Sequence, residues 1–185
     1  MPQKFNYIDF SNSITSTPRK SASLSKDRYI SNEFMDLEWE GIWTKTWLFA
    51  GIESDLAEVG DFFVYDIGRE SIVITRDEEM KISAFYNVCQ HRGNKIVTIE
   101  SGSFNKVSCP YHGWTYSLNG KLEHVPDREL FEGGVPCEEH SLKPVRVSIW
   151  AGLIFVNMDE KSSSLETFLG PILSLIHISE PTRPY

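Results

Sequence analysis

The stretch from Cys89 to Trp114 reads CQHRGNKIVTIESGSFNKVSCPYHGW and is the most informative part of the chain. It pairs one cysteine with one histidine twice, first in Cys89-Gln90-His91 and then in Cys109-Pro110-Tyr111-His112. Thiolates and imidazoles are the protein ligands that soft transition metals prefer. A glycine follows each run, Gly93 and Gly113, and lets the backbone come close to a bound group. The stretch therefore predicts two loops that hold one metal centre between them.

Two kinds of metal centre use this ligand set. In a [2Fe–2S] cluster, two cysteines can hold one iron while two histidines hold the other, which raises the reduction potential above that of an all-cysteine cluster. The same four side chains could instead hold a structural zinc ion in tetrahedral geometry, although zinc sites usually show knuckles such as Cys-x-x-Cys. The Cys-x-His spacing favours the cluster, and with it the transfer of single electrons.

The composition limits the class of protein. The chain has 185 residues, of which 41% are hydrophobic, and this is enough apolar material for one good core. Its net charge of −8 argues against a nucleic-acid surface, which needs a basic face. No apolar run reaches the roughly 18 residues of a membrane span, and the first residues have no signal-peptide core. We therefore expect a cytoplasmic protein without a nucleic-acid or membrane partner.

Short β-rich segments with turns between them predict a mainly β fold, an antiparallel β-sandwich or small barrel preceded by a short amphipathic helix. Residues 1–30 are expected to be a polar arm and residues 31–46 a helix that packs on the sheet, with Ser31 as its N-cap and with Met35, Trp39 and Ile42 at helical spacing. Residues 47–158 are expected to be the β domain. The expected strands cover residues 62–67, 71–75, 81–86, 107–108, 114–117, 121–124, 145–149 and 152–156.

Two turns and three further side chains complete this part of the prediction. Gly68-Arg69 indicates a tight turn, and Asn119-Gly120 indicates a hairpin with a type I′ turn. Cys137 is interpreted as a small apolar residue, so that no internal disulfide is expected. His124 and His140 are interpreted as ordinary histidines outside the metal centre.

The runs FYNVCQHRG (residues 85–93) and CPYHGW (residues 109–114) resemble the N-terminal part of the α subunit of Rieske non-haem iron oxygenases, of the type that hydroxylates aromatic rings. The resemblance extends from about Glu33 to Asp159. It implies a Rieske domain in which Cys89 and Cys109 bind one iron of a [2Fe–2S] cluster and His91 and His112 bind the other. It also implies a surrounding shell made of Arg92, Gly93, Pro110, Tyr111, Gly113 and Trp114.

The resemblance also implies a function. In this family, electrons from NAD(P)H pass through a reductase or a ferredoxin to the cluster, and then to a mononuclear Fe(II) that uses O₂ to hydroxylate an aromatic or related organic substrate. The intact proteins are homotrimers or α3β3 assemblies. The alternative is a stand-alone Rieske-type ferredoxin, although such a carrier would need neither the helix nor the segment after Asn157. A structural zinc module is the third reading.

A second class of Rieske proteins belongs to the respiratory and photosynthetic cytochrome complexes. Those proteins carry a disulfide between the loops, where this chain has Asn94 and Tyr111. They also carry a serine whose hydroxyl donates to the cluster, where this chain has Trp114. Fewer donors to sulfur predict a lower potential, which suits reduction from NAD(P)H.

The mononuclear iron would need two histidines and a carboxylate. After Asn157 the sequence contains one histidine, His177, so no catalytic residue is assigned in this chain. Residues 159–172 are expected to begin a truncated C-terminal catalytic domain. Residues 173–185 resemble the translation of a sequencing adapter and are expected to be a non-native tail, so His177 carries no functional weight.

Overall fold

The computed structural model describes residues 25–126, 128–131, 134, 139–170 and 172. Cys137, His177, the tail at residues 173–185 and most of the polar arm lie outside the described residues. The chain divides into two compact units, residues 1–36 and residues 37–185. No helix among the described residues is long and apolar enough to cross a membrane.

The first unit holds α1 (Asp27–Ile30) and the start of α2 (Asn32–Glu38). The Ser31 hydroxyl oxygen accepts a hydrogen bond from the Phe34 amide at 3.2 Å, and the Ser31 hydroxyl donates to the Glu33 carboxylate at 2.6 Å. This is the arrangement of an N-cap. The prediction that a helix begins after Ser31 is therefore confirmed.

The end and the buried face of this helix differ from the prediction. After Glu38 the chain forms a π-helix, η2 (Trp39–Trp43), and the helical segment ends at Trp43 rather than at residue 46. The Thr44 amide bonds to the Trp39 carbonyl, and this five-residue step widens the turn. Trp39 is buried and lies against Gly68, while Ile42 is 53% exposed and Met35 is 42% exposed. The apolar face is thus carried by Trp39 and its neighbour Trp43, not by Met35 and Ile42.

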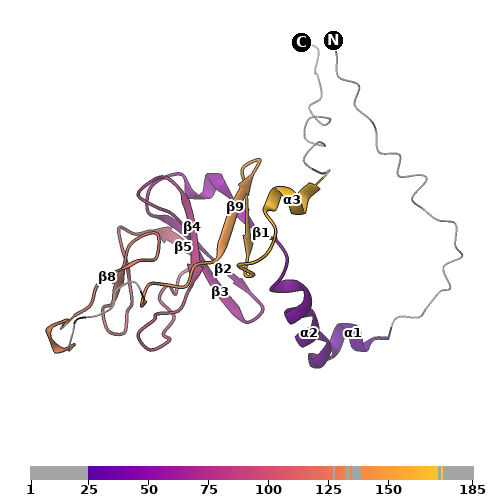
Figure 1. Ribbon diagram of the computed structural model, residues 1–185, viewed down its shortest axis with the longest axis horizontal. Helices are drawn as coiled ribbons and strands as arrows, with labels where there is room; N and C mark the ends of the chain where they lie inside the picture. The colour runs from indigo at the N-terminus through magenta and orange to yellow at the C-terminus, as the bar shows by residue number, and fades with distance from the viewer. Residues whose placement is uncertain (1–24, 127, 132–133, 135–138, 171, 173–185) are drawn as a thin grey trace, which may run out of the picture. The chain divides into compact units, whose positions relative to one another are not determined.

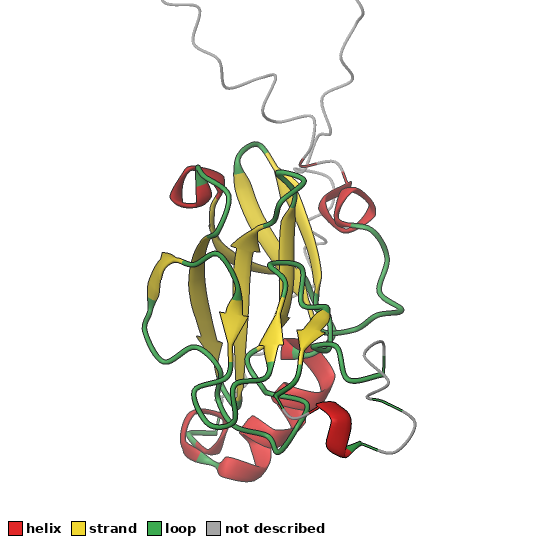
Figure 2. Cartoon of the chain, turned by 90° about the vertical axis from the view of Figure 1, so that its left-hand side faces the viewer, coloured by secondary structure: helices red, strands yellow, loops and turns green. Residues whose placement is uncertain are grey.

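The described part of the second unit forms three antiparallel sheets (Figures 1 and 2). The first has the order β1 (Leu48–Ile52), β10 (Leu153–Asn157), β9 (Arg146–Trp150). The second has the order β4 (Ile82–Tyr86), β3 (Glu70–Arg76), β2 (Asp61–Ile67), β5 (Ser101–Ser103). The third has the order β6 (Val107–Ser108), β7 (Thr115–Tyr116), β8 (Leu122–His124).

These sheets confirm the mainly β, antiparallel fold class, and in the described residues they do not close into a barrel. The expected strands are present, with bounds that differ by one or two residues. Besides η2, the described part of the second unit contains three further short helices outside the sheets: η3 (Glu53–Leu56), η4 (Arg128–Leu130) and α3 (Leu165–Leu169). One core cluster lies between the first two sheets, and a second contains Cys89, Cys109, Trp114 and Tyr116.

The hairpin between β7 and β8 is present, but its predicted turn type is wrong. Gly120 has a positive φ of 87°, whereas Asn119 does not, and a type I′ turn needs both. The Gly120 amide bonds to the Ser117 carbonyl at 2.9 Å, so Leu118 and Asn119 occupy a type I turn and Gly120 follows it as a bulge. Packing decides this geometry, because Leu118 is buried and its carbonyl accepts a hydrogen bond from the Thr75 hydroxyl.

Candidate metal centre

Loop 1 (residues 89–94) and loop 2 (residues 109–114) close by the same backbone hydrogen bonds. In loop 1 the Cys89 carbonyl accepts from the Gly93 amide at 2.9 Å, and the Cys89 amide donates to the Asn94 carbonyl at 2.9 Å. In loop 2 the matching bonds join Cys109 to Gly113 at 3.0 Å and to Trp114 at 2.8 Å. Each cysteine thus stands at the base of its own small ring of backbone bonds.

The glycines of the two loops have the same conformation. Gly93 has a φ of 75° and Gly113 a φ of 72°, which are left-handed values that side chains disfavour. At Gly113 an added Cβ would also come within 3.3 Å of Pro126. Both glycines are therefore required by the turn itself, in addition to the close approach to a bound group that the sequence suggested.

The two cysteines are buried in the same core cluster, each with 2% of its surface exposed, and both are free thiols. Burial raises the pKa of the Cys89 thiol, while a hydrogen bond with Tyr116 and the backbone amide of His91 act in the opposite direction. A thiol in this setting stays protonated until a metal ion takes the place of the proton.

The side chains of His91 in loop 1 and His112 in loop 2 lie next to each other. The ring centres of His91 and His112 lie 4.6 Å apart, with the ring planes at 71°. His91 Nδ1 is buried and has no hydrogen-bond partner among the described residues. Burial, and then the nearby His112, Arg92 and His140, lower the pKa of His91, which favours the neutral imidazole that metals bind.

Two aromatic side chains of loop 2 cover these histidines. Trp114 is buried and stacks on His91 with 4.7 Å between ring centres and 8° between planes. Tyr111 stacks on His112 at 3.7 Å and is 61% exposed. Trp114 therefore covers one face of the His91 ring, while Tyr111, which lies on His112, is itself exposed to solvent.

The donor set fits a cluster of two irons better than a single metal ion. Among the described residues, no three His, Cys, Asp or Glu side chains are grouped as one metal ion would require. A structural zinc ion takes four protein ligands at one point, whereas each iron of a histidine-ligated [2Fe–2S] cluster takes two. Two buried thiols, one buried unpartnered imidazole nitrogen and two matched loops agree with the second arrangement.

The remaining predicted residues lie near this centre or at its edge. Arg92 and Pro110 are exposed at the loop tips. The His140 ring lies 5.6 Å from the Trp114 ring, and His124 is exposed at the end of β8. Asn94 Nδ2 donates a hydrogen bond to the Lys95 carbonyl at 2.7 Å. The same nitrogen is 3.9 Å from Cys109 Sγ, which is long for a hydrogen bond.

Sequence reasoning missed two residues that support the loops. The Tyr116 hydroxyl lies 3.3 Å from Cys89 Sγ and accepts a hydrogen bond from the Gln90 amide at 3.2 Å. Asn87 is buried two residues before Cys89 and binds backbone groups of Ile96 and Val97. The available signal for Asn87 was an amide side chain directly after the β-rich segment that leads to Cys89, whereas no local signal set Tyr116 apart.

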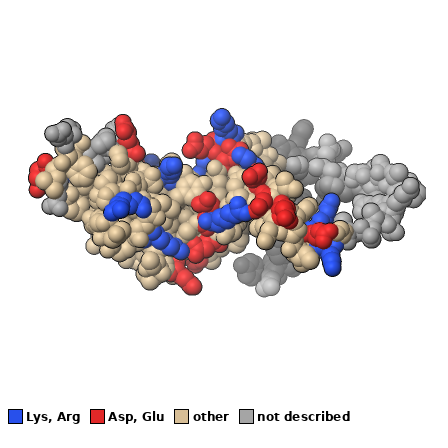
Figure 3. Space-filling model, turned by 90° about the horizontal axis from the view of Figure 1, so that it is seen from below, with Lys and Arg blue, Asp and Glu red and all other residues tan. Residues whose placement is uncertain are grey.

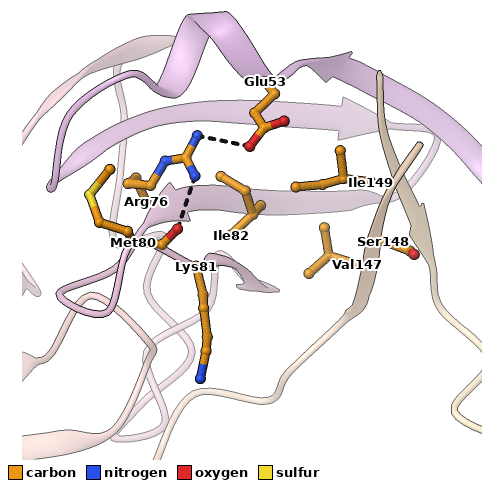
Figure 4. Close-up of a pocket in the computed structure, with 8 residues that line it drawn as sticks. All are labelled: Glu53, Arg76, Met80, Lys81, Ile82, Val147, Ser148 and Ile149. Atoms are coloured by element: carbon orange, nitrogen blue, oxygen red, sulfur yellow. Dashed lines mark hydrogen bonds and ion pairs between the residues drawn. The ribbon is translucent and has the colours of Figure 1, made fainter. Parts of the chain in front are cut away.

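A hollow lies away from the two loops, between β9 and the edge formed by β3 and β4 (Figure 4). It has a volume of about 320 Å³, and Arg76 lies at its upper side. The Arg76 guanidinium donates to the carbonyls of Leu56 and Met80 and pairs with Glu53 at 3.3 Å. Because the Arg76 guanidinium is already paired with Glu53 and with backbone carbonyls, we interpret this hollow as a structural feature and not as a binding site.

Figure 3 shows charged side chains of both signs intermixed over one face of the molecule.

Curated relatives are similar to this chain over most of its length. It is 33% identical over 166 residues to the glycine betaine monooxygenase oxygenase subunit of Pseudomonas aeruginosa, and the aligned region covers 87% of this chain and 36% of that protein. It is 36% identical over 149 residues to the biphenyl dioxygenase subunit alpha of Paraburkholderia xenovorans, which covers 77% of this chain and 32% of that protein. The chain thus spans about a third of the length of these relatives.

Solved structures agree with these relatives. The apo form of the quaternary ammonium Rieske monooxygenase CntA matches with a TM-score of 0.78 and 33% identity, over 84% of this chain and 45% of that chain. Naphthalene 1,2-dioxygenase from Rhodococcus sp. matches with a TM-score of 0.75 and 34% identity, over 79% of this chain and 34% of that chain. Residues 46–139, which include both loops, match the model of the Rieske [2Fe-2S] domain. The chain belongs to the Rieske [2Fe–2S] domain family.

Proposed function

We propose that this chain is the electron-transfer domain of an oxygenase α subunit. The observation that carries the proposal is the pair of matched loops, which present two buried thiols and two imidazoles to one another. The relatives support it, because they are named as oxygenase subunits and the chain aligns with about a third of their length.

In this proposal Cys89 and Cys109 hold one iron, and His91 and His112 hold the other. When bound, the cluster supplies a one-electron carrier with a potential above that of an all-cysteine cluster. Burial lowers the pKa of His91, which favours the neutral imidazole, and its Nδ1 has no hydrogen-bond partner among the described residues that would compete with a metal. Trp114 covers one side, and the exposed Tyr111 beside the half-buried His112 marks the edge at which we propose that a redox partner approaches.

The whole protein would extend this activity. An NAD(P)H-dependent reductase or a ferredoxin would deliver electrons, and a mononuclear Fe(II) in a further domain would use O₂ to hydroxylate an aromatic or related organic substrate. One solved relative, a quaternary ammonium Rieske monooxygenase, is described in terms of inter-subunit electron transfer. That description supports an assembly of several subunits, which we propose to be a homotrimer or an α3β3 assembly in which neighbouring subunits complete the electron path. A cytoplasmic location fits an NAD(P)H donor and reduced thiols.

The segment after β10 distinguishes this proposal from a stand-alone ferredoxin. The Trp47 indole donates to the Ser163 carbonyl at 3.0 Å, and Arg146 donates to Ser162. Leu165 and Leu169 of α3 are buried in a cluster with Trp47. This extension packs on the β domain, whereas the sequence suggested that it begins a separate domain, and a stand-alone ferredoxin would not need it.

Electron paramagnetic resonance of the reconstituted chain, reduced with dithionite without air, tests the proposal. We expect a rhombic signal with an average g value below that of an all-cysteine [2Fe–2S] cluster, together with hyperfine coupling from ¹⁵N-labelled histidine. The variants Cys89→Ser, Cys109→Ser, His91→Ala and His112→Ala should each lose the signal, while His124→Ala should keep it. Stoichiometric zinc without an iron–sulfur signal would refute the proposal and favour a structural metal site.

A further inference from the structure

The turn between β7 and β8 contains Asn119-Gly120, the only asparagine–glycine pair in the sequence. Asparagine is a thermolabile residue, because a backbone amide nitrogen can attack its side-chain carbon. Glycine has no side chain, so its nitrogen is the least hindered nucleophile that can follow an asparagine. Asn119 is exposed, so water can also reach the product of this attack. The pair is therefore the most reactive of its kind in the chain.

The reaction is deamidation, and it needs no cofactor and no oxidant. The Gly120 amide nitrogen loses its proton and bonds to Cγ of Asn119. The bond from Cγ to the side-chain nitrogen breaks, and ammonia leaves with that proton, which gives a cyclic imide. Water then opens the ring at either carbonyl carbon, and the product is aspartate or isoaspartate. In isoaspartate the main chain runs through the former side chain and is longer by one CH₂ group.

The folded turn keeps the reacting atoms apart. Leu118 and Asn119 occupy a type I turn, in which the second central residue has a ψ of about 0°. At that angle the Gly120 nitrogen is rotated away from the Asn119 side chain, so the ring cannot close. The Gly120 amide also donates a hydrogen bond to the Ser117 carbonyl at 2.9 Å, which holds the proton that the reaction has to remove.

Further contacts hold the turn in this conformation. The Ser117 hydroxyl donates to the side-chain oxygen of Asn119 at 2.7 Å. The Gly120 carbonyl accepts a hydrogen bond from the Leu142 amide at 2.8 Å. Leu118 is buried, and its carbonyl accepts a hydrogen bond from a side chain of β3 at 2.8 Å. The turn has to open before the imide can form, and these contacts determine how often it opens.

The isoaspartate form does not fit the closed turn. Gly120 is buried with a φ of 87°, and a Cβ added to it would lie 3.2 Å from Phe85 and 3.3 Å from Leu142. An extra CH₂ group just before Gly120 would push the backbone into this close-packed region. Because β7 begins directly after loop 2, the hairpin that cannot re-form is the one on which loop 2 rests.

We propose that Asn119 is a deamidation site that the folded β7–β8 hairpin keeps closed, and that its conversion to isoaspartate is an irreversible mark of hairpin opening. The inference goes beyond the proposed function and does not depend on a bound cluster. A hairpin that opens and closes again is unchanged, whereas one that reacts while open loses its turn for good.

Peptide mass mapping measures the rate of this reaction, because deamidation replaces NH by O in the peptide that contains Asn119. The cluster-free chain is incubated at mildly alkaline pH beside the same chain in urea and a synthetic peptide of residues 114–124. The peptide and the unfolded chain should react at similar rates. The folded chain should react at least about tenfold more slowly, because only the open hairpin reacts. Equal rates in the folded chain and the peptide would overturn the inference.

Two variants test the contacts that hold the turn. Ser117→Ala removes the hydroxyl that binds Asn119, and its folded rate, divided by that of the peptide with the same substitution, should rise about fivefold for the loss of one hydrogen bond. Ser101→Ala, on the exposed strand β5, should leave the rate unchanged. A Ser117→Ala rate equal to that of the wild type would contradict the inference. If Ser117→Ala does not fold, the comparison of the folded wild type with the peptide decides.

The modified chain gives a third measurement. Chains deamidated in urea are returned to buffer, and the isoaspartate form is separated from the unmodified form. The isoaspartate form should unfold at a lower urea concentration, because its turn cannot close on Gly120. Equal unfolding midpoints for the two forms would refute the claim that isoaspartate does not fit the turn.

Discussion

The Asn87 side chain holds the backbone that follows loop 1, and removal of this side chain gives a sharp test of the described fold. The Asn87 side-chain oxygen accepts hydrogen bonds from the amides of Ile96 at 3.1 Å and Val97 at 2.8 Å. Its side-chain amide donates to the Val97 carbonyl at 2.8 Å and to the Ser71 hydroxyl at 3.2 Å. One side chain thus joins the end of β4, the return of loop 1 and the start of β3.

The magnitude follows from the groups that Asn87→Ala would leave unpaired. Ile96 and Val97 are buried, so two amides and one carbonyl would lose their partner in the core. At about 1–3 kcal/mol for each of these three unsatisfied groups, the free energy of unfolding should fall by about 3–9 kcal/mol. This is a large share of the roughly 5–15 kcal/mol that stabilises a typical domain.

Urea unfolding of the cluster-free chain, followed by tryptophan fluorescence, measures this loss. With a slope of about 2 kcal/mol per molar urea, the midpoint should fall by about 1.5 M or more. Asn105→Ala is the matched control, because Asn105 is exposed, and its free energy of unfolding should stay within about 0.5 kcal/mol of wild type. Equal midpoints for the two variants would refute the assignment of Asn87 as the anchor of loop 1.

Three further outcomes are expected. Gly113→Ala should destabilise the chain by about 1–2 kcal/mol in thermal unfolding, because its φ is left-handed, whereas Gly41→Ala, with open space around it, should not. Arg76→Met should cost about 2 kcal/mol in urea unfolding, because the carbonyls of Leu56 and Met80 lose their donors; an unchanged midpoint would contradict this. A hydrogen bond from Ser71 and then the charge of Lys95 lower the pKa of Asp66. The ionised Asp66 carboxylate therefore adds to the free energy of unfolding above about pH 4, and this contribution is lost as the pH falls through the lowered pKa of the folded state. The difference in stability between wild type and Asp66→Asn should therefore be below about 1 kcal/mol at pH 7 and vanish near pH 2; a difference that grows in acid would contradict the assignment.

Much of the fold was predictable because its signals are local. The Ser31 cap and the runs of β-branched and aromatic residues in β2, β3 and β10 are encoded within a few neighbouring positions. β5 was missed because Ser-Gly-Ser has no β-forming side chain, and it is a strand only because it pairs with β2. The turn at Asn119-Gly120 was mistaken because the burial of Leu118 overrides the preference of the dipeptide.

The candidate site divides in the same way. The spacing of cysteine and histidine predicted two loops around one centre, and the structure places the two cysteines in one core cluster and the two imidazole rings 4.6 Å apart. The contacts of Tyr116 with Cys89 and of Asn87 with Val97 depend on how separate strands pair. No rule of local spacing contains that pairing, so the residues that hold the loops could only be found in three dimensions.

The closed rings of hydrogen bonds in the two loops bear on how the protein matures. Each ring is completed by the chain's own amides and carbonyls, and none of these bonds passes through the metal centre. A zinc finger, in contrast, is unfolded until its metal arrives. We therefore expect the assembly machinery of the cell to deliver its cluster to a folded acceptor. Loss of the cluster to oxidation would then leave an intact domain that can be refilled rather than a chain that must be degraded.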